Sequence, residues 1–195
     1  MTQVDKPGVR LAEVRMSRRR VLTAGMLMGA AVWCAPALAN ALTYDSDPYE
    51  RSLAFYNTHT SERLKTIYWI QGVYLPEALQ EMYRILRDHR ANAMRPIDIH
   101  LFDLLYAMQC KLETRRPFHV VSGYRTPQTN ALLRARRRGV AKNSLHIQGR
   151  AVDIRLPGTE SAVIRRVALS LHAGGVGYYP QSDFVHVDTG PVRSW

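Results

Sequence analysis

A carboxylate in the middle of a predicted strand constrains the fold of this chain more than any other feature. The segment Ala151–Leu156 alternates apolar and polar residues, as a half-buried β-strand does, and its apolar side chains leave Asp153 on the opposite face. A charge that is partly removed from water is costly unless it has a partner. The fold must therefore supply Asp153 with either a neighbouring arginine, Arg150 or Arg155, or a metal ion.

Two histidines are placed to complete a metal site with this carboxylate. His146 precedes a Gln148-Gly149 turn, which would bring its imidazole back alongside Asp153. A second alternating segment, Phe184–Asp188, carries His186 on its polar face. Two imidazoles and one carboxylate are the ligand set of a catalytic zinc ion, which takes three protein ligands and keeps its fourth position for water. Such a site makes water a nucleophile near neutral pH.

Two further carboxylates near His186 are candidates for the group that accepts a proton during hydrolysis. Asp183 precedes the strand and is free to turn towards the site. Asp188 follows His186 by two residues, so alternation puts both on the same face. We favour Asp183, and Asp188 stays the alternative.

The first 39 residues have the pattern of a cleavable export signal. A basic cluster with the pair Arg18-Arg19 precedes an uncharged stretch, Val21–Ala39, which ends in the small residues of Ala37-Leu38-Ala39. The arginine pair resembles a twin-arginine signal. A membrane anchor is the alternative, but the stretch contains glycines and a proline and is barely long enough to span a bilayer. We expect residues 1–39 to be removed and the protein to reach the periplasm or cell envelope, contacting the membrane only transiently through this signal.

Residues 40–195 have the pattern of one small α+β domain. The chain has 195 residues and is 46% hydrophobic, which excludes disorder and suits a single core. Hydrophobic periodicity predicts a central antiparallel sheet with flanking helices and an N-terminal β-hairpin. The predicted strands are 51–56, 64–70, 118–121, 151–156 and 184–188, and the predicted helices are 76–90, 97–112, 127–138 and 162–171.

The net charge of +11 does not by itself indicate a nucleic-acid partner. Six of the 27 basic residues and two of the 16 acidic residues lie in the leader, which leaves 21 and 14 and a net charge of +7 in the rest. The basic run Arg134–Arg138 is either a solvated helix face or a surface for anionic wall polymers. The sequence contains no recognisable nucleic-acid-binding module, so we expect no nucleic-acid partner.

Three motifs resemble one family of bacterial cell-wall enzymes. The segment Ser144–Asp153 reads SLHIQGRAVD and matches the S-x-H-x-x-G-x-A-x-D signature of the D-alanyl-D-alanine metallopeptidases. Residues 122–126, SGYRT, resemble their S-G-Y-R-[ST] turn, and residues 183–186, DFVH, occupy the place of their [DE]-x-x-H. With GGVGYY at 174–179 and FVHVDTG at 184–190, the chain resembles most closely the murein endopeptidase K family, over about residues 50 to 195.

The resemblance implies a fold, a metal and a reaction. It implies a small α+β fold around an antiparallel sheet, one zinc ion per chain, and hydrolysis of peptide crosslinks between the stem peptides of peptidoglycan. Carried over position by position, His146, Asp153 and His186 would be the zinc ligands. Arg125 would stabilise the carbonyl oxygen of the substrate as it becomes an oxyanion.

One departure from the family pattern affects the general base. The relatives that cut D-alanyl-D-alanine have a glutamate at the position of Asp183, and an aspartate is one methylene shorter. Asp188 therefore stays in consideration. The resemblance does not distinguish D,D from L,D crosslinks, or endopeptidase from carboxypeptidase action. The alternative function is a non-catalytic wall-binding or scaffold protein with a relic metal site, against which the complete ligand set and Arg125 argue.

Two less specific features have competing interpretations. Ser144 either caps a turn, which we favour, or supports a ligand by a hydrogen bond. Tyr178 and Tyr179 either line a substrate groove or pack beside the glycines, as such tyrosines more often do.

Overall fold

The structure is a computed structural model that describes residues 49–136 and 139–195. All of these residues belong to one compact unit, Leu42–Trp195. The predicted export signal, residues 1–39, lies outside the described residues. Within the described ranges, no helix is both long enough and apolar enough to cross a membrane.

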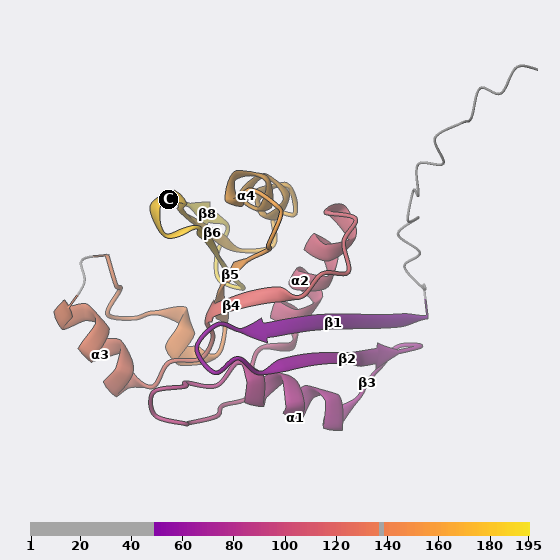
Figure 1. Ribbon diagram of the computed structural model, residues 1–195, viewed down its shortest axis with the longest axis horizontal. Coiled ribbons are helices and arrows are strands. Elements are labelled where there is room, and N and C mark those ends of the chain that lie inside the picture. The colour runs from indigo at the N-terminus through magenta and orange to yellow at the C-terminus, as the bar shows by residue number, and fades with distance from the viewer. Residues whose placement is uncertain (1–48, 137–138) are drawn as a thin grey trace, which may run out of the picture. The chain divides into compact units, whose positions relative to one another are not determined.

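In the described part of the chain, eight strands form one mixed sheet (Figure 1). The strands are β1 (Glu50–Asn57), β2 (Arg63–Ile70), β3 (Val73–Tyr74), β4 (Phe118–Ser122), β5 (Ala151–Arg155), β6 (Gly175–Tyr179), β7 (Phe184–Asp188) and β8 (Arg193–Ser194). Their order across the sheet is β3-β2-β1-β4-β5-β7-β6-β8. The predicted α+β class is confirmed, and β1 and β2 form the predicted antiparallel hairpin. The sheet is not wholly antiparallel, because β1 pairs with β4, and β6 with β8, in parallel.

The described residues also form four α-helices and two short 3-10 helices. They are α1 (Pro76–Ile85), α2 (Ile99–Lys111), α3 (Pro127–Arg136), η1 (Leu145–Gln148), α4 (Ser161–Ser170) and η2 (Pro180–Ser182). Proline opens α1, where its fixed φ suits the first turn, and Asp98 caps α2 by accepting a hydrogen bond from the His100 amide. α1 ends earlier than the predicted residue 90, because the chain turns back at Asp88, which pairs with Ala93.

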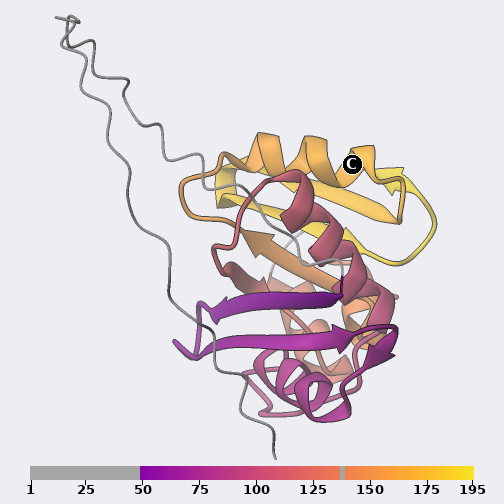
Figure 2. The same ribbon diagram turned by 90° about the vertical axis from the view of Figure 1, so that its right-hand side faces the viewer.

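Three helices cover the hydrophobic core. α1 packs on β1 and β2, α4 packs on β6 and β7, and α2 contacts both β1 and α4. Figure 2 shows α4, α2 and α1 in succession along the sheet, whereas Figure 1 shows α3 apart from them. The strands contribute alternate residues to the core, among them Phe55, Val120, Ile154 and Val187, each at most 1% exposed. The remaining strand positions are therefore free to carry polar groups on the other face of the sheet.

Candidate metal centre and active site

Asp153 and His186 face each other across two neighbouring strands. β5 and β7 are antiparallel, and their register pairs these two residues directly. Because Val152 and Val185 point into the core, alternation directs Asp153 and His186 to the opposite face. Both side chains are nonetheless buried, with residue exposures of 5% for Asp153 and 8% for His186.

His146 reaches the same place from the short helix η1. Ser144 caps that helix, accepting a hydrogen bond from the His146 amide at 3.4 Å, as the turn-capping interpretation expects. Gly149 ends it in the left-handed conformation, with φ of 70°, which glycine adopts without strain. The chain then reverses into β5. This reversal brings the His146 imidazole to Asp153, as predicted from the Gln148-Gly149 turn.

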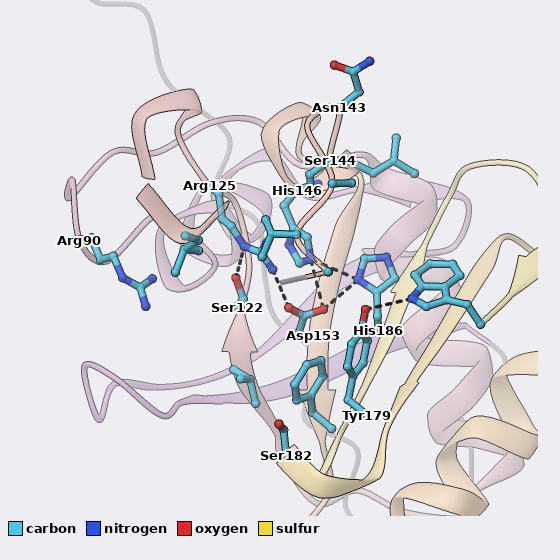
Figure 3. A pocket seen from close by; sticks show the side chains of 18 of the residues that line it. Arg90, Ser122, Arg125, Asn143, Ser144, His146, Asp153, Tyr179, Ser182 and His186 are labelled. Carbon is cyan, nitrogen blue, oxygen red and sulfur yellow. Dashed lines mark hydrogen bonds and ion pairs between the residues drawn. The ribbon is translucent and has the colours of Figure 1, made fainter. Parts of the chain in front are cut away.

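Three side-chain atoms converge at the base of a cleft (Figure 3). Asp153 Oδ1 lies 2.8 Å from His186 Nδ1 and 3.2 Å from His146 Nε2. The two nitrogens are themselves 3.2 Å apart. In a tetrahedral zinc site with bonds of about 2.0–2.1 Å, ligand atoms are separated by about 3.3 Å. The three atoms therefore have nearly the spacing that zinc requires.

The outer nitrogens of both histidines are held by acceptors. His146 Nδ1 lies 2.7 Å from the carbonyl oxygen of Gly123, which only accepts, so Nδ1 carries the proton and Nε2 presents a lone pair. His186 Nε2 donates to Asp188 Oδ2 at 3.0 Å, which leaves Nδ1 facing the cluster. Two ring nitrogens and a carboxylate oxygen are thus directed at one point. This donor set fits a cation such as zinc.

Burial and neighbouring charge shift the pKa values of all three residues. Complete burial lowers the pKa of His146, although Asp153 opposes the shift. Burial would also lower the pKa of His186, but hydrogen bonds to Asp153 and Asp188 raise it above its ordinary value. Burial would raise the pKa of Asp153, but His146 and His186 hold it far below its usual range. The carboxylate is therefore ionised, and a proton on His186 competes with a metal ion for the same nitrogen.

Arg125 is the cation that pairs with Asp153. Its Nη2 donates to Asp153 Oδ2 at 2.7 Å, and its Nε donates to Ser122 Oγ at 2.7 Å. Burial lowers the pKa of Arg125 while Asp153 opposes the shift, and a guanidinium stays charged under such conditions. Neither Arg150 nor Arg155, the arginines considered from the sequence, makes this pair, and Arg150 lies against Asp98 instead.

The two candidate proton acceptors lie in different environments. Asp188 is fully buried and accepts hydrogen bonds from His186, Arg193 and the amides of Gly175 and Gly190. Asp183 is exposed, in the left-handed conformation at the end of η2, and is not among the residues that line the cleft. The structure thus brings Asp188 next to His186 but does not bring Asp183 to the cluster.

The cluster opens into a cleft of about 400 Å³. Arg125 lies on one side of the cluster and Tyr179 on the other (Figure 3), and the C-terminal Trp195 also lines the cleft. Trp195 Nε1 donates to the Tyr179 hydroxyl at 2.9 Å, and its ring centroid lies 5.3 Å from that of His186. Tyr179 therefore lines a groove, whereas Tyr178 packs against the core. A cleft of this size, with a buried donor set at its base, suits a peptide substrate.

Arg90, Arg193 and Trp195 are among the cleft residues that were not predicted from the sequence. A cation and an indole shortly after the His186 strand are visible in the sequence, but their place depends on the pairing of β8 with β6. Arg90 comes from a turn far from the motifs in the sequence. None of the three falls in a motif whose spacing indicates chemistry.

Comparisons with known proteins agree with these features. A family model described as "Peptidoglycan L,D-endopeptidase MepK" matches residues 45–195. A protein of that name from Escherichia coli strain K12 is 46% identical over 180 residues, which cover 92% of this chain and 97% of the relative. "Probable peptidoglycan L,D-endopeptidase MepK" of Haemophilus influenzae is 43% identical over 157 residues, covering 80% of this chain and 84% of the relative.

Proposed function

This chain belongs to the family of peptidoglycan L,D-endopeptidase MepK, and from that premise we propose that it hydrolyses L,D crosslinks between the stem peptides of peptidoglycan, using one zinc ion per chain. Family membership makes the chain a peptidase. One observation carries the proposal: donor atoms of His146, Asp153 and His186 converge at the base of a cleft that Arg125 also lines.

We assign His146, Asp153 and His186 as the zinc ligands. Two imidazoles and a carboxylate favour zinc over magnesium or calcium, which prefer oxygen ligands. When bound, zinc supplies a Lewis acid that makes water nucleophilic near neutral pH. The chain's own contribution is to hold the three ligands, because each is fixed by a hydrogen bond to a backbone carbonyl, a carboxylate or a guanidinium.

Arg125 is proposed to stabilise the negative charge that develops on the carbonyl oxygen of the scissile bond. Its Nε and Nη2 are committed to Ser122 and Asp153, whereas its Nη1 makes no hydrogen bond to any described residue. Two of its three nitrogens therefore fix the orientation of the guanidinium, and the third is available to donate. A donor that is already oriented stabilises an oxyanion without further reorganisation.

For the group that accepts the proton of the attacking water, we retain Asp183. Its neighbours Ser182 and Phe184 line the cleft, so a rotation of this turn would turn its carboxylate inward. Asp188 is less suitable as a base, because it is 0% exposed and engaged by several donors. We assign Asp188 the role of positioning His186 instead.

The proposed substrate places the enzyme in the periplasm or cell envelope. The leader with Arg18-Arg19 supports export by the twin-arginine route, which carries folded proteins. A protein exported in this way would reach its substrate with its fold already formed.

The direct test is digestion of crosslinked peptidoglycan by the purified, zinc-loaded protein, with the released peptides identified by mass spectrometry. We expect cleavage of L,D-crosslinked dimers, loss of cleavage in His146→Ala, and full cleavage in His100→Ala. His100 is an exposed histidine on α2 and is therefore a matched control. If the wild-type protein binds peptidoglycan but releases no peptide from any crosslink, the proposed enzymatic function is wrong and the protein is a wall-binding protein instead.

A further inference from the structure

Arg90 differs from the other two arginines that line the cleft. Arg125 pairs with Asp153 at 2.7 Å, and Arg193 pairs with Asp188 at 2.6 Å. Arg90 is exposed, and no carboxylate within residues 49–136 and 139–195 forms an ion pair with it. The cleft therefore carries one guanidinium whose charge no described side chain neutralises.

A single buried carboxylate fixes the turn from which Arg90 projects. Asp88 is 2% exposed, and its Oδ1 accepts hydrogen bonds from the amides of Arg90 at 3.0 Å and Ala91 at 3.4 Å. Its Oδ2 accepts from the amide and the hydroxyl of Thr126, both at 2.9 Å. Thr126 directly follows Arg125 in the chain. Asp88 thus links the backbone at Arg90 to the backbone at Thr126, next to Arg125. The backbone positions of the two arginines are therefore fixed relative to each other.

A second contact holds the same turn from its other side. The rings of His89 and His59 are stacked, with centroids 4.0 Å apart and an interplanar angle of 15°. His59 Nε2 lies 3.0 Å from the carbonyl oxygen of Val121, at the end of β4. The segment that carries Arg90 is therefore fixed both to the Arg125 turn and to the sheet.

The charge along the cleft favours an anionic ligand at Arg90. Asp153 carries the sole acidic side chain among the described lining residues, and Arg125 and the proposed metal already engage it. Figure 3 shows Arg90 beyond Arg125 as seen from Asp153, with Tyr179 on the other side of the cluster. A peptide whose reacting carbonyl meets Arg125 would therefore extend past Arg90 in one direction.

We propose that Arg90 binds a free carboxylate of the diamino acid at the crosslink and so selects crosslinks that retain this charge. The inference rests on the proposed function. Where the diamino acid of the crosslink carries a carboxylate on the same carbon as the amide nitrogen, negative charge lies close to the scissile bond. A guanidinium suits this group because its planar N–H donors match both carboxylate oxygens.

The test pairs one protein change with one substrate change. The substrates are an L,D-crosslinked dimer whose diamino acid has a free carboxylate on the carbon that carries the amide nitrogen, and the same dimer with this carboxylate amidated. We expect Arg90→Gln to lower kcat/KM on the free acid about 10- to 100-fold, mainly through a higher KM, with little change on the amide. Arg90→Lys should recover part of the loss on the acid, because it restores the charge without the planar donors.

Arg166→Gln is the matched control. Arg166 is an exposed arginine on α4, outside the cleft. Its replacement removes the same charge and should leave kcat/KM on both dimers unchanged. If Arg90→Gln lowers kcat/KM equally on the acid and the amide dimer, or on neither, the inference is overturned while the proposed function stands. Wild-type protein that cleaves neither dimer would overturn the proposed function and this inference with it.

Discussion

The hydrogen bonds at the outer nitrogens of His146 and His186 determine what their inner nitrogens offer to a metal ion. His146 Nδ1 donates to the Gly123 carbonyl, and His186 Nε2 donates to the Asp188 carboxylate. Both groups accept a hydrogen bond and cannot donate one at neutral pH, so both rings present a lone pair to the cluster once the inner nitrogen is deprotonated. The residues that accept hydrogen bonds from the outer nitrogens, Gly123 and Asp188, are therefore part of the site.

The first prediction contrasts two isosteric changes, Asp188→Asn and Asp183→Asn. An amide at position 188 can donate to His186 Nε2, which favours a proton on Nδ1. We expect this change to lower metal affinity about 10- to 100-fold. Asp183→Asn should leave metal affinity unchanged and lower kcat by about 10²- to 10⁴-fold, because a general base is lost.

Zinc affinity and kcat, both measured on both variants, separate the two roles. Unchanged metal affinity in Asp188→Asn would contradict the positioning role. Unchanged turnover in Asp183→Asn would show that the proton of the attacking water goes to another group.

The second prediction concerns His89 and the pH dependence of stability. Burial, together with His59 and Arg90, lowers the pKa of His89 to about 4, while Asp88 opposes the shift. Between about pH 6.5 and pH 4 the unfolded chain binds a proton at His89 that the folded chain does not, so stability falls as the pH falls.

Replacement of His89 by asparagine removes this contribution. For a partly exposed ring, solvent screening reduces the effect to about 1–2 kcal/mol between pH 7 and pH 4.5. Urea unfolding of the wild type and His89→Asn at both pH values measures it. A wild type and variant that lose equal stability over this range would contradict the assignment.

At the scale of elements, the turn between β4 and α3 connects the metal centre to the rest of the fold. The Gly123 carbonyl accepts from His146, and the Tyr124 amide donates to the Leu86 carbonyl at 2.7 Å. A Cβ at Gly123 would lie 2.3 Å from the Leu86 carbonyl oxygen. The turn and the end of α1 thus approach too closely for any larger residue.

The third prediction is that Gly123→Ala displaces this turn and, with it, Arg125. We expect a destabilisation of about 1–3 kcal/mol by overpacking, measured by urea unfolding. We also expect a fall in kcat/KM at a temperature where the variant is folded. Gly72→Ala is the control: it lies at φ of 92° in open space, so it should cost stability without changing kcat/KM. Full activity in folded Gly123→Ala would contradict the link between the turn and Arg125.

Elements with a clear hydrophobic period could be predicted from the sequence, and glycine-rich or very short ones could not. β5 and β7 alternate, so both their positions and the side of the sheet that Asp153 takes follow from the pattern. β6 was not predicted, because two of its five residues, Gly175 and Gly177, are glycines and glycine is rare in strands. At Gly177 the reason is steric: a Cβ would lie 2.8 Å from the Trp195 ring. That contact depends on β8, which has two residues and no sequence pattern of its own.

At the scale of the whole molecule, the parts of the site that lie in a motif or on an alternating strand were predicted, and the parts placed only by packing between distant turns and short strands were not. His146 and Asp153 share one motif, and His186 lies on an alternating strand, so their convergence follows from the pattern. The role of Arg125 entered only through the family resemblance. Arg90 reaches the cleft through hydrogen bonds of Asp88 to a turn nearly forty residues later, and no periodicity carries that information.

The fourth prediction concerns export of the whole chain. Replacing Arg18 and Arg19 by lysines keeps the positive charge but removes the arginine pair that a twin-arginine receptor reads. We expect translocation to stop, measured as the ratio of mature to precursor protein in cell fractions. A general secretory signal would tolerate the change, so unchanged export would contradict the twin-arginine route.

The fifth prediction, the zinc content of the purified protein, tests the central claim most directly. Elemental analysis by mass spectrometry should find one zinc ion per chain in the wild type and in His100→Ala. His146→Ala and Asp153→Ala should contain far less zinc. Each variant loses one of the three ligands, and the two that remain do not hold the metal ion in a stable geometry. Stoichiometric zinc in both of these variants would contradict the assignment of His146, Asp153 and His186 as the metal centre.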